Sequence, residues 1–517
     1  MRLEFIIPDG LCLEEVLATL QRTMRTLTKP SRTVYRTFYD SFDWRLYLDD
    51  SLLEDTCEDN VHTLVLRTLT GKNRCPRLML KKFPNFTSEL PPGPLRKILE
   101  PVLGVRELVP KVRLRSRLHS LRILNKNEKT VAYLVIEEND PLRQKGVRAG
   151  KLDKRATVIP VKGFLKPANK IAELLQEQGL TPAPDNLMLA ALAFCGEIPA
   201  AYTSKLVLNL DAAMRADWAT KLILHRLLDI MLQNEAGTRT GTDSEFLHDF
   251  RVAIRRTRSA LTQIKRVFPK RVVDRYKNEF AWLGLMTSPS RDLDVYLLGF
   301  DEYRDSLPAS MQADIEPLRD FLIRHQREEH KALVKALDSA RYRRLIKNWR
   351  SFLEKPVKER TRLKNAGRPV LEVASKRIWR VYKLILKEGA AIQPETPAAA
   401  LHELRKSCKK LRYLMEFFQS LYPAARITEL IKLLKTLQGN LGDFQDYEVQ
   451  VMTLKKYSHQ MMAEDNVSAD TLLAMGMLIE GLERRQQQAR AAFSGTFAGF
   501  SAQANQKRFR KLFATSH

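Results

Sequence analysis

The sequence predicts a multidomain α+β protein, in which an N-terminal antiparallel β-barrel or tunnel precedes a duplicated all-α region built as four-helix bundles. Three observations support this fold class. Residues 1–200 alternate short runs of β-type residues with turn signals. Residues 205–517 carry apolar side chains at a helical period almost throughout. A twelve-residue pattern inside that helical region occurs twice at a fixed offset, which indicates duplication of one structural unit.

Length and charge narrow the possible functions. A chain of 517 residues is too long for one hydrophobic core and predicts two or three domains. Its 44% hydrophobic content is ordinary for a globular protein. The 87 lysines and arginines outnumber the 60 aspartates and glutamates, so the formal net charge is +27. An excess of that size predicts a polyanionic partner such as nucleic acid, polyphosphate or an anionic membrane surface.

The five cysteines predict neither a disulfide framework nor a metal site, because they are scattered and form no Cys-x-x-Cys pair. We therefore expect free thiols, no bound metal and no cofactor. The N-terminal residues lack the apolar core of a secretory signal. The longest apolar run, Leu187–Cys195, is far shorter than the ~20 residues that span a bilayer. These features predict a cytoplasmic protein without membrane insertion.

Strands dominate the expected structure of residues 1–200. The candidate strands are Arg2–Ile7, Val34–Tyr39, Arg45–Leu48, Thr63–Leu69, Arg77–Lys82, Lys111–Ile123, Val131–Glu137 and Val158–Val161. Helices are expected only at Leu13–Leu27 and Asn169–Gln178. Many strands with few helices favour a closed or strongly curved antiparallel sheet.

One expected strand alternates cationic and apolar residues. In an extended strand, this alternation directs Lys111, Arg113, Arg115 and Arg117 to one face of the sheet. That face is either a solvated outer surface or a barrel interior that is lined to hold an anion.

The N-terminal pattern resembles the CYTH family, the tunnel-shaped β-barrels of triphosphatases and class IV adenylate cyclases. Residues 38–46 read FYDSFDWRL, which is similar to the family's Tyr/Phe-Asp-Thr stretch running into Arg-Leu. The resemblance implies that Arg67, Lys81 and the strand from Lys111 to Arg117 supply basic tunnel residues able to bind an anion. It covers most of residues 1–200.

The acidic residues that define the CYTH family are largely missing. The family begins with a Glu-x-Glu-x-Lys strand, whereas the first strand here reads RLEFIIP and contains only Glu4. The late strand Val158–Val161 carries no acid either. Since hard divalent cations need several carboxylate oxygens, we expect a degenerate barrel without metal-dependent hydrolysis. A metal-dependent inorganic triphosphatase in this barrel is the alternative function.

Proline- and glycine-bearing stretches at 181–185 and 196–203 place the domain boundary near residue 200. The predicted domains are a barrel over 1–200, a helical region over 205–500 with repeats at about 205–350 and 365–500, and a basic tail over 501–517. The helices expected in the helical region are Ser204–Glu235, 244–268, Arg271–Leu285, Asp292–Tyr303, Pro308–Leu337, Arg341–Phe352, Arg368–Gly389, Pro397–Leu421, Ala424–Leu441, Gln445–Met462 and Ser468–Phe493.

The repeated pattern contains the residues that are predicted to bind a ligand. Residues 247–258 read LHDFRVAIRRTR, and residues 401–412, an offset of 154, read LHELRKSCKKLR. At ~100° per residue each copy places one histidine and three cations on a common helix face. These are His248, Arg251, Arg255 and Arg258 in the first copy, and His402, Arg405, Lys409 and Arg412 in the second. The apolar positions, which should be buried, are Leu247, Phe250, Ile254, Leu261 and Ile264, and Leu401, Leu404, Cys408, Met415 and Phe418.

The cationic stripe is either an ordinary solvated face or a binding surface. Solvated helix faces usually mix charges of both signs, because like charges at i,i+4 destabilise the helix. Two copies in the same register, with almost no acid on the stripe, favour binding. Further candidates near this face or on a neighbouring helix are Arg256, Lys406, Lys410, Arg226, Arg380 and Lys383. His225, His325, His330 and His459 are interpreted as structural or surface residues, and no residue is predicted to be catalytic.

This duplicated pattern is similar to the CHAD family, the conserved histidine α-helical domain. Two further motifs support the resemblance: RDLDV at 291–295 and LGDFQD at 441–446. The resemblance implies two pseudo-symmetric four-helix bundles whose motif helices face a basic groove or pore. It also implies that this groove binds inorganic polyphosphate, with a possible location on polyphosphate granules. The oligomeric state stays open.

The chemistry of the stripe fits such a ligand. Polyphosphate carries about one charge per phosphate and has no bases to read, so its receptor needs closely spaced donors. Arginine provides forked hydrogen bonds to phosphate oxygens, and protonation of the two histidines at acidic pH should tighten binding. A nucleic-acid-binding protein is a second alternative with the same electrostatics. It would need stacking aromatics or a groove-reading motif, which the sequence does not show. The predicted function is therefore non-catalytic polyphosphate binding.

Overall fold

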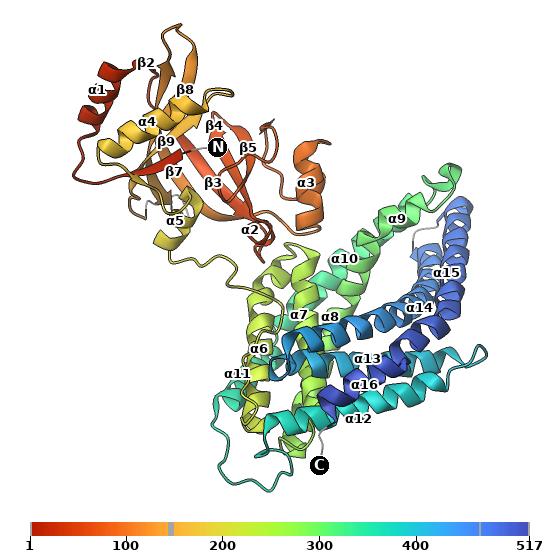
Figure 1. Ribbon diagram of the computed structural model, residues 1–517. Helices are drawn as coiled ribbons and strands as arrows, with labels where there is room; N and C mark the ends of the chain where they lie inside the picture. Colours follow the sequence, from red (N-terminus) through yellow and green to blue (C-terminus); the bar gives the residue numbers. More distant parts are fainter. Residues whose placement is uncertain (1–2, 143–148, 465–466, 515–517) are drawn as a thin grey trace. The chain divides into compact units, whose positions relative to one another are not determined.

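The computed structural model describes residues 3–142, 149–464 and 467–514. The chain divides into two compact units, Met1–Thr203 and Ser204–His517. The first is built on an antiparallel sheet and the second is helical (Figure 1), which confirms the predicted fold class. Among the described residues, no helix combines the length and apolar character needed to cross a bilayer.

The first unit contains one sheet of ten described strands, and all neighbouring strands in it are antiparallel. The strands are β1 (Leu3–Ile7), β2 (Arg25–Thr28), β3 (Arg32–Asp40), β4 (Ser51–Glu58), β5 (Val61–Thr68), β6 (Leu78–Leu80), β7 (Val109–Leu124), β8 (Thr130–Leu142), β9 (Lys154–Pro160) and β10 (Thr181–Pro182). Their order is β10-β1-β9-β8-β7-β3-β4-β5-β6, and β2 pairs with β7. The described ladder is not closed between β6 and β10. Residues from β1, β3, β4, β5, β8 and β9 nevertheless line one small cavity, so the sheet curls into a tunnel-like shape.

Short helices complete this unit. They are α1 (Leu13–Thr23), α2 (Arg45–Leu48), α3 (Pro94–Leu103), α4 (Leu165–Glu177) and α5 (Leu187–Phe194). The strand expected at Arg45–Leu48 is wrong, because this segment is the helical turn α2. The buried carboxylate of Asp40 accepts hydrogen bonds from the backbone N–H groups of Leu46 and Tyr47 (2.9 Å each). The Ser41 hydroxyl accepts another from the N–H of Arg45 (3.0 Å), and these bonds cap the turn.

The second unit is an array of helices. They are α6 (Ala216–Thr240), α7 (Ser244–Gln263), α8 (Lys270–Leu298), α9 (Phe300–Asp305), α10 (Glu316–Leu337), α11 (Ala340–Glu354), α12 (Val370–Ala390), α13 (Ala398–Phe417), α14 (Ala424–Glu464), α15 (Ala469–Ser501) and α16 (Gln503–Phe513). Two helices were expected in the segment of α8 and two in that of α14, but each segment is one continuous helix. Pro289 lies inside α8, which continues through it.

The predicted basic tail over 501–517 is also corrected. Its described part forms α16, whose Phe509 and Phe513 are buried. Phe509 stacks on Tyr382 of α12, with 3.8 Å between the ring centroids. The apolar residues between the lysines and arginines therefore anchor this segment to the helical core.

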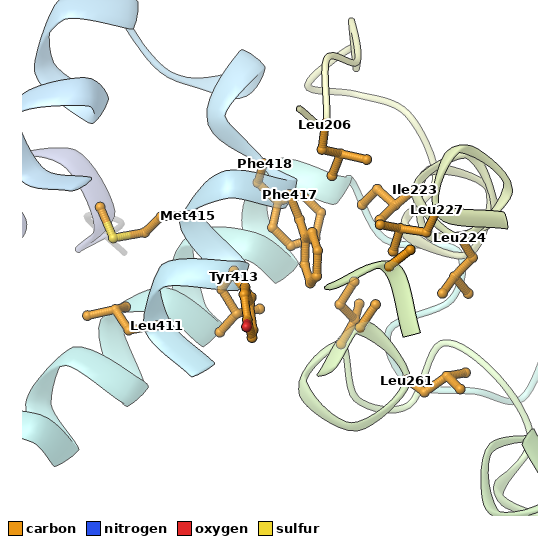
Figure 2. Close-up of a cluster of buried hydrophobic side chains, with 14 of the residues drawn as sticks. Leu206, Ile223, Leu224, Leu227, Leu261, Leu411, Tyr413, Met415, Phe417 and Phe418 are labelled. Carbon is orange, nitrogen blue, oxygen red and sulfur yellow. The ribbon is translucent and has the colours of Figure 1, made fainter. Parts of the chain in front are cut away.

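One apolar core joins the two sequence repeats. Figure 2 shows part of it, where Leu206, Ile223 and Leu227 from the first repeat lie near Phe417 and Phe418 from the second. The repeats are consequently not independent bundles, and their motif helices α7 and α13 are held beside each other. A second core contains the ends of α8 and α14 together with α9, α10 and α15. Both long helices thus run from one core into the other.

Candidate functional site

The two motif helices turn their apolar stripes into the core. Helix α7 begins after Asp243, whose carboxylate accepts hydrogen bonds from the N–H groups of Glu245 and Phe246 (2.9 and 3.2 Å). All ten apolar positions predicted for the two copies are buried. Because these positions occupy one side of each helix, the cationic stripes face away from the core.

The cationic stripes meet at one large cavity of about 1150 Å³. The first copy contributes His248, Arg251 and Arg255, and the second contributes His402, Arg405 and Lys409. The C-terminal part of α8 and the C-terminal half of α14 supply most of the remaining wall, including Arg291 and Lys456. Six residues selected from two distant stretches of sequence therefore share one site.

Two smaller hollows adjoin this cavity along the motif helices. One, of about 320 Å³, is lined by Arg251, Arg255 and Arg258. The other, of about 310 Å³, is lined by Arg255, Arg258, Lys406, Lys409 and Lys410. Arg255 borders all three spaces, so they form a row along the two helices. This arrangement suits an extended ligand better than a compact one.

The two arginines that follow the histidines by three residues are held differently. Arg251 donates from Nη1 to the hydroxyls of Thr287 and Ser288, both at 2.9 Å. Arg405 donates from Nη2 to the carboxylate of Asp446 at 3.0 Å. In the described part of the chain, the hydrogen bonds of Arg251 therefore go to neutral groups, and Asp292 acts on its charge without a hydrogen bond, whereas Arg405 is bonded directly to an acid.

The two histidines have equivalent partners in the duplicated frame. Arg291 donates from Nη2 to Nδ1 of His248 (3.2 Å), and Gln445, which lies 154 positions after Arg291, contacts Nδ1 of His402. Because a guanidinium group only donates, His248 accepts at Nδ1 and carries its proton on Nε2. Each histidine is thus oriented by α8 or α14 toward the shared cavity.

Burial and crowding of like charges change the acidity of the cavity cations. Burial is the largest cause that lowers the pKa of Lys409 to about 8, and the charges of the neighbouring Arg405 and Arg255 contribute to the same shift. Burial likewise lowers the pKa of Arg251 to about 10, although Asp292 opposes the change. Burial raises the pKa of Asp292, while Arg251 and Arg291 act to lower it. Like charges therefore repel one another around this cavity, and a bound polyanion would offset that repulsion.

Several predicted residues lie outside these three spaces. Arg256 donates to Glu416 at 2.9 Å and to the backbone carbonyl of Ser204 at 3.1 Å. Arg256 is therefore held in a structural ion pair. As the residue after Arg255, it projects ~100° further round the helix and so points away from the cavity. Arg412 turns toward Glu416 (3.6 Å), one turn along α13. Neither residue lines the cavity.

The further candidates on α6 and α12, namely Arg226, Arg380 and Lys383, also lie outside the row of cavities. Arg226 is partly buried on α6, and Arg380 is exposed on α12. Lys383 is exposed, with its ammonium group 5.9 Å from the centroid of the Trp379 ring. Helix α12 packs beside α13 but contributes no wall to these spaces.

Sequence reasoning missed part of the wall. Helix α10 contributes His325, interpreted above as structural or surface, together with Glu329. Tyr296 of α8 and Tyr457 of α14 also line the cavity. No periodic signal marks His325 and Glu329, because α10 lies outside the repeated motif and reaches the site only through tertiary packing.

The inner face of the first unit carries ion pairs in place of free cations. Arg36 contacts Glu137 at 2.8 Å and Glu54 at 3.5 Å, and Arg67 also pairs with Glu54. Arg155 lies 3.4 Å from Glu4. The cavity that several of these residues line is only about 40 Å³. Among the predicted basic residues of this unit, Arg67 faces this interior, where it is already neutralised.

The interior interpretation of the β7 cations is wrong for three of them. Arg113, Arg115 and Arg117 are exposed, while the alternating positions 112, 114, 116 and 118 are buried. Opposite these arginines, β8 places Asp140 beside Arg115 and Glu138 beside Arg117. Cross-strand carboxylates thus make this an ordinary mixed-charge outer face.

Two other predicted cations of this unit lie apart from the inner face. Lys81 is exposed. Lys111 is half-buried, with its ammonium group 4.2 Å from the centroid of the Trp44 ring, and burial lowers its pKa to about 8. In the part of the chain that the structure describes, no three His, Cys, Asp or Glu side chains are placed to hold a metal ion together.

Comparison with known proteins finds a family match over part of the helical unit. Residues 222–455 match the family model of the CHAD domain, which confirms the predicted resemblance. No curated protein matches the chain. Similar solved structures include the CHAD domain from the plant Ricinus communis, with 26% identity, a TM-score of 0.48, and coverage of 58% of this chain and 97% of that one.

Two further solved structures are similar over a smaller share of this chain. One is a proposed adenylate cyclase from Bacillus halodurans, with 11% identity, a TM-score of 0.26, and coverage of 36% of this chain and 94% of that one. The other is a proposed adenylyl cyclase from Hippeastrum with a dominant triphosphatase activity. It has 14% identity, a TM-score of 0.27, and coverage of 39% of this chain and 99% of that one.

Proposed function

With a CHAD domain at residues 222–455, we propose that this protein binds inorganic polyphosphate, without catalysis, in the cavity between α7 and α13. One observation carries the proposal: His248, Arg251 and Arg255 from one repeat line the same cavity as His402, Arg405 and Lys409 from the other. Two rows of donors that face a common space match a flexible chain of phosphates, since each arginine or lysine can contact phosphate oxygens. Residence on polyphosphate granules is part of the same proposal.

Nucleic acid is the less suitable ligand for this cavity. Single-stranded nucleic acid is usually held by aromatic rings on which bases stack. The two aromatic residues of the wall, Tyr296 and Tyr457, pack edge to face against each other, with ring centroids 5.7 Å apart. Both rings also pack in the second apolar core. The cations and hydroxyls of the wall can therefore bind phosphate groups, whereas its two tyrosine rings pack against each other and do not offer a platform for bases. The same wall also carries the carboxylates of Asp292, Glu329 and Asp446.

The proposal is tested by titration and competition. The full chain is titrated with polyphosphate while salt is varied, and RNA is then added as a competitor. Four cations of the large cavity, Arg251, Arg255, Arg405 and Lys409, contact the ligand in this proposal. At about 0.7 per phosphate contact, the slope of log association constant against log salt is expected to be about −3. Displacement of polyphosphate by RNA at physiological salt would favour the nucleic-acid alternative.

The proposal also predicts a pH dependence above neutrality. Lys409 has a pKa of about 8 in the free protein, and a bound polyanion raises it. Binding therefore favours the protonated form, so affinity is highest below about pH 8 and falls as the pH rises further. We expect a loss of several-fold between about pH 7 and pH 9, measured by titration.

Lys409→Arg is the matched control for this effect, because arginine stays charged over that range. Its affinity is expected to stay nearly constant between the two pH values. An equally steep decline in Lys409→Arg would show that another group controls the pH dependence.

The triphosphatase alternative has weaker support. The inner arginines of the first unit are already paired with Glu4, Glu54 and Glu137, and the space beside them is small. Incubation of the full chain with tripolyphosphate and magnesium or manganese is expected to release no phosphate above the uncatalysed rate. Phosphate release above that rate by the unmodified chain would overturn the non-catalytic part of the proposal.

A further inference from the structure

A second group of cations begins where the row of cavities ends. Gln263, at the end of α7, lines the 310 Å³ hollow. Its side-chain oxygen accepts a hydrogen bond from Nη2 of Arg377 on α12 at 2.6 Å. Arg380 follows one turn later on α12, and Lys265 follows Gln263 by two residues. The last turn of α7 and the neighbouring face of α12 therefore extend the positive surface of the hollow.

The connection between α11 and α12 continues this surface. Asn365 donates from its side chain to the backbone carbonyl of Lys265 at 2.7 Å, and from its N–H to the carbonyl of Arg266 at 3.2 Å. These bonds attach residues 355–369 to the end of α7. The connection contains one acid, Glu359, and six cations: Lys355, Lys358, Arg360, Arg362, Lys364 and Arg368.

Four cations around the end of α7 form no ion pair in the described part of the chain, although the charges of Lys410 and Glu403 interact. Among the described residues, no carboxylate forms an ion pair with Lys265, Arg377, Arg380 or Lys410. The pKa of Lys265 is lowered, first by the charge of Arg377 and then by burial and by Arg380. Solvated surfaces usually intersperse both signs of charge. An uncompensated group that adjoins an anion-binding cavity has the electrostatics of a continuation of that site.

We propose that Lys265, Arg377, Arg380 and the connection 355–369 form an exit track, along which a polyphosphate chain too long for the cavity leaves it. This inference rests on the proposed function and adds a preference for chain length. A short oligophosphate makes all its contacts within the cavity and its adjoining hollows. A longer chain also contacts the track, releases more counterions and binds more tightly.

The variant that tests the track is Lys265→Gln/Arg380→Gln, because both side chains are exposed and their replacement leaves the core intact. The matched control is Arg343→Gln/Lys347→Gln on α11, which removes one arginine and one lysine that are likewise exposed. Helix α11 packs against α6, α8 and α10 and does not line the row of cavities. The two variants therefore change net charge equally.

The full chain and both variants are titrated with short-chain and with long-chain sodium polyphosphate at several salt concentrations. The track variant is expected to lose several-fold affinity for the long chains and to keep its affinity for the short ones. Its salt slope for long chains should fall by about 1.4, the contribution of two phosphate contacts at about 0.7 each. The control variant should keep the preference of the unmodified protein for long chains.

The other possible outcomes would contradict either the exit track or the proposed function, and they can be told apart. Equal losses for short and long chains in the track variant, or no loss at all, would overturn the exit track while leaving the cavity assignment intact. The same selective loss in the control variant would show that net charge alone sets the preference. If the unmodified protein binds neither chain length, the proposed function itself is refuted.

Discussion

Replacing Arg251 and Arg405 together with alanine is expected to weaken polyphosphate binding by at least tenfold, while the protein stays folded. Both side chains line the large cavity, one from each repeat. A hydrogen bond to a charged group contributes roughly 1.5–3 kcal/mol, and about 1.4 kcal/mol corresponds to a factor of ten. Titration with polyphosphate measures the loss, and thermal unfolding of the same sample verifies that the fold is intact.

The single variants add a sharper test. Arg251 is bonded to the neutral hydroxyls of Thr287 and Ser288, whereas Arg405 is paired with Asp446. A ligand must compete with that carboxylate for Arg405 but not for Arg251. Arg251→Ala is therefore expected to lose more affinity than Arg405→Ala. Unchanged affinity in a folded double variant would remove this cavity from the binding site.

The second large effect is on stability. Arg36→Met is expected to lower the free energy of unfolding of the first unit by about 3–5 kcal/mol, because it removes the ion-pair partner of the buried Glu137 carboxylate and one of the two partners of Glu54. The Arg36 side chain is only 12% exposed and contacts Glu137 at 2.8 Å and Glu54 at 3.5 Å. Burial acts to lower the pKa of Arg36, but Glu137 and Glu54 outweigh it and raise the pKa above its ordinary value. Chemical denaturation followed by circular dichroism measures the loss.

Arg113→Met is the matched control on the same sheet, since Arg113 is exposed on the outer face of β7. Its effect on stability should be small. In Arg36→Met the Glu137 carboxylate stays buried without this cationic partner, and burial disfavours its charged form in the folded state. The stability deficit is then expected to shrink as the pH falls. A deficit of the same size at acidic and neutral pH would contradict the ion-pair explanation.

The local sequence pattern was sufficient to predict the helical character of the second unit and the buried sides of its two motif helices. The period of apolar residues identified which side of α7 and α13 is buried, and all ten predicted positions are buried. The offset of 154 residues identified the two copies, because duplicated sequence retains its register. Helix ends were less predictable. Breaks were expected from the sequence at residues 286–291 and 442–444, but packing of α8 and α14 against two cores keeps each helix continuous.

Charge pattern alone did not determine which cations bind a ligand. Arg255 and Arg256 are neighbours in sequence, yet Arg255 borders three adjoining cavities and Arg256 pairs with Glu416, 160 residues away. Similarly, the alternation of Arg113, Arg115 and Arg117 placed them on one face, but only the sheet shows that this face is the outer one.

The duplicated motif and the buried stripes could therefore be predicted from the sequence. The helical period depends on residues that are close in sequence, and the repeat is recognised because its two copies align without gaps. The shared cavity, the contribution of His325 from α10 and the paired interior of the sheet required the tertiary structure. Each of these depends on a partner that lies many residues away, and the partner decides whether a charge is neutralised within the protein or left to meet a ligand.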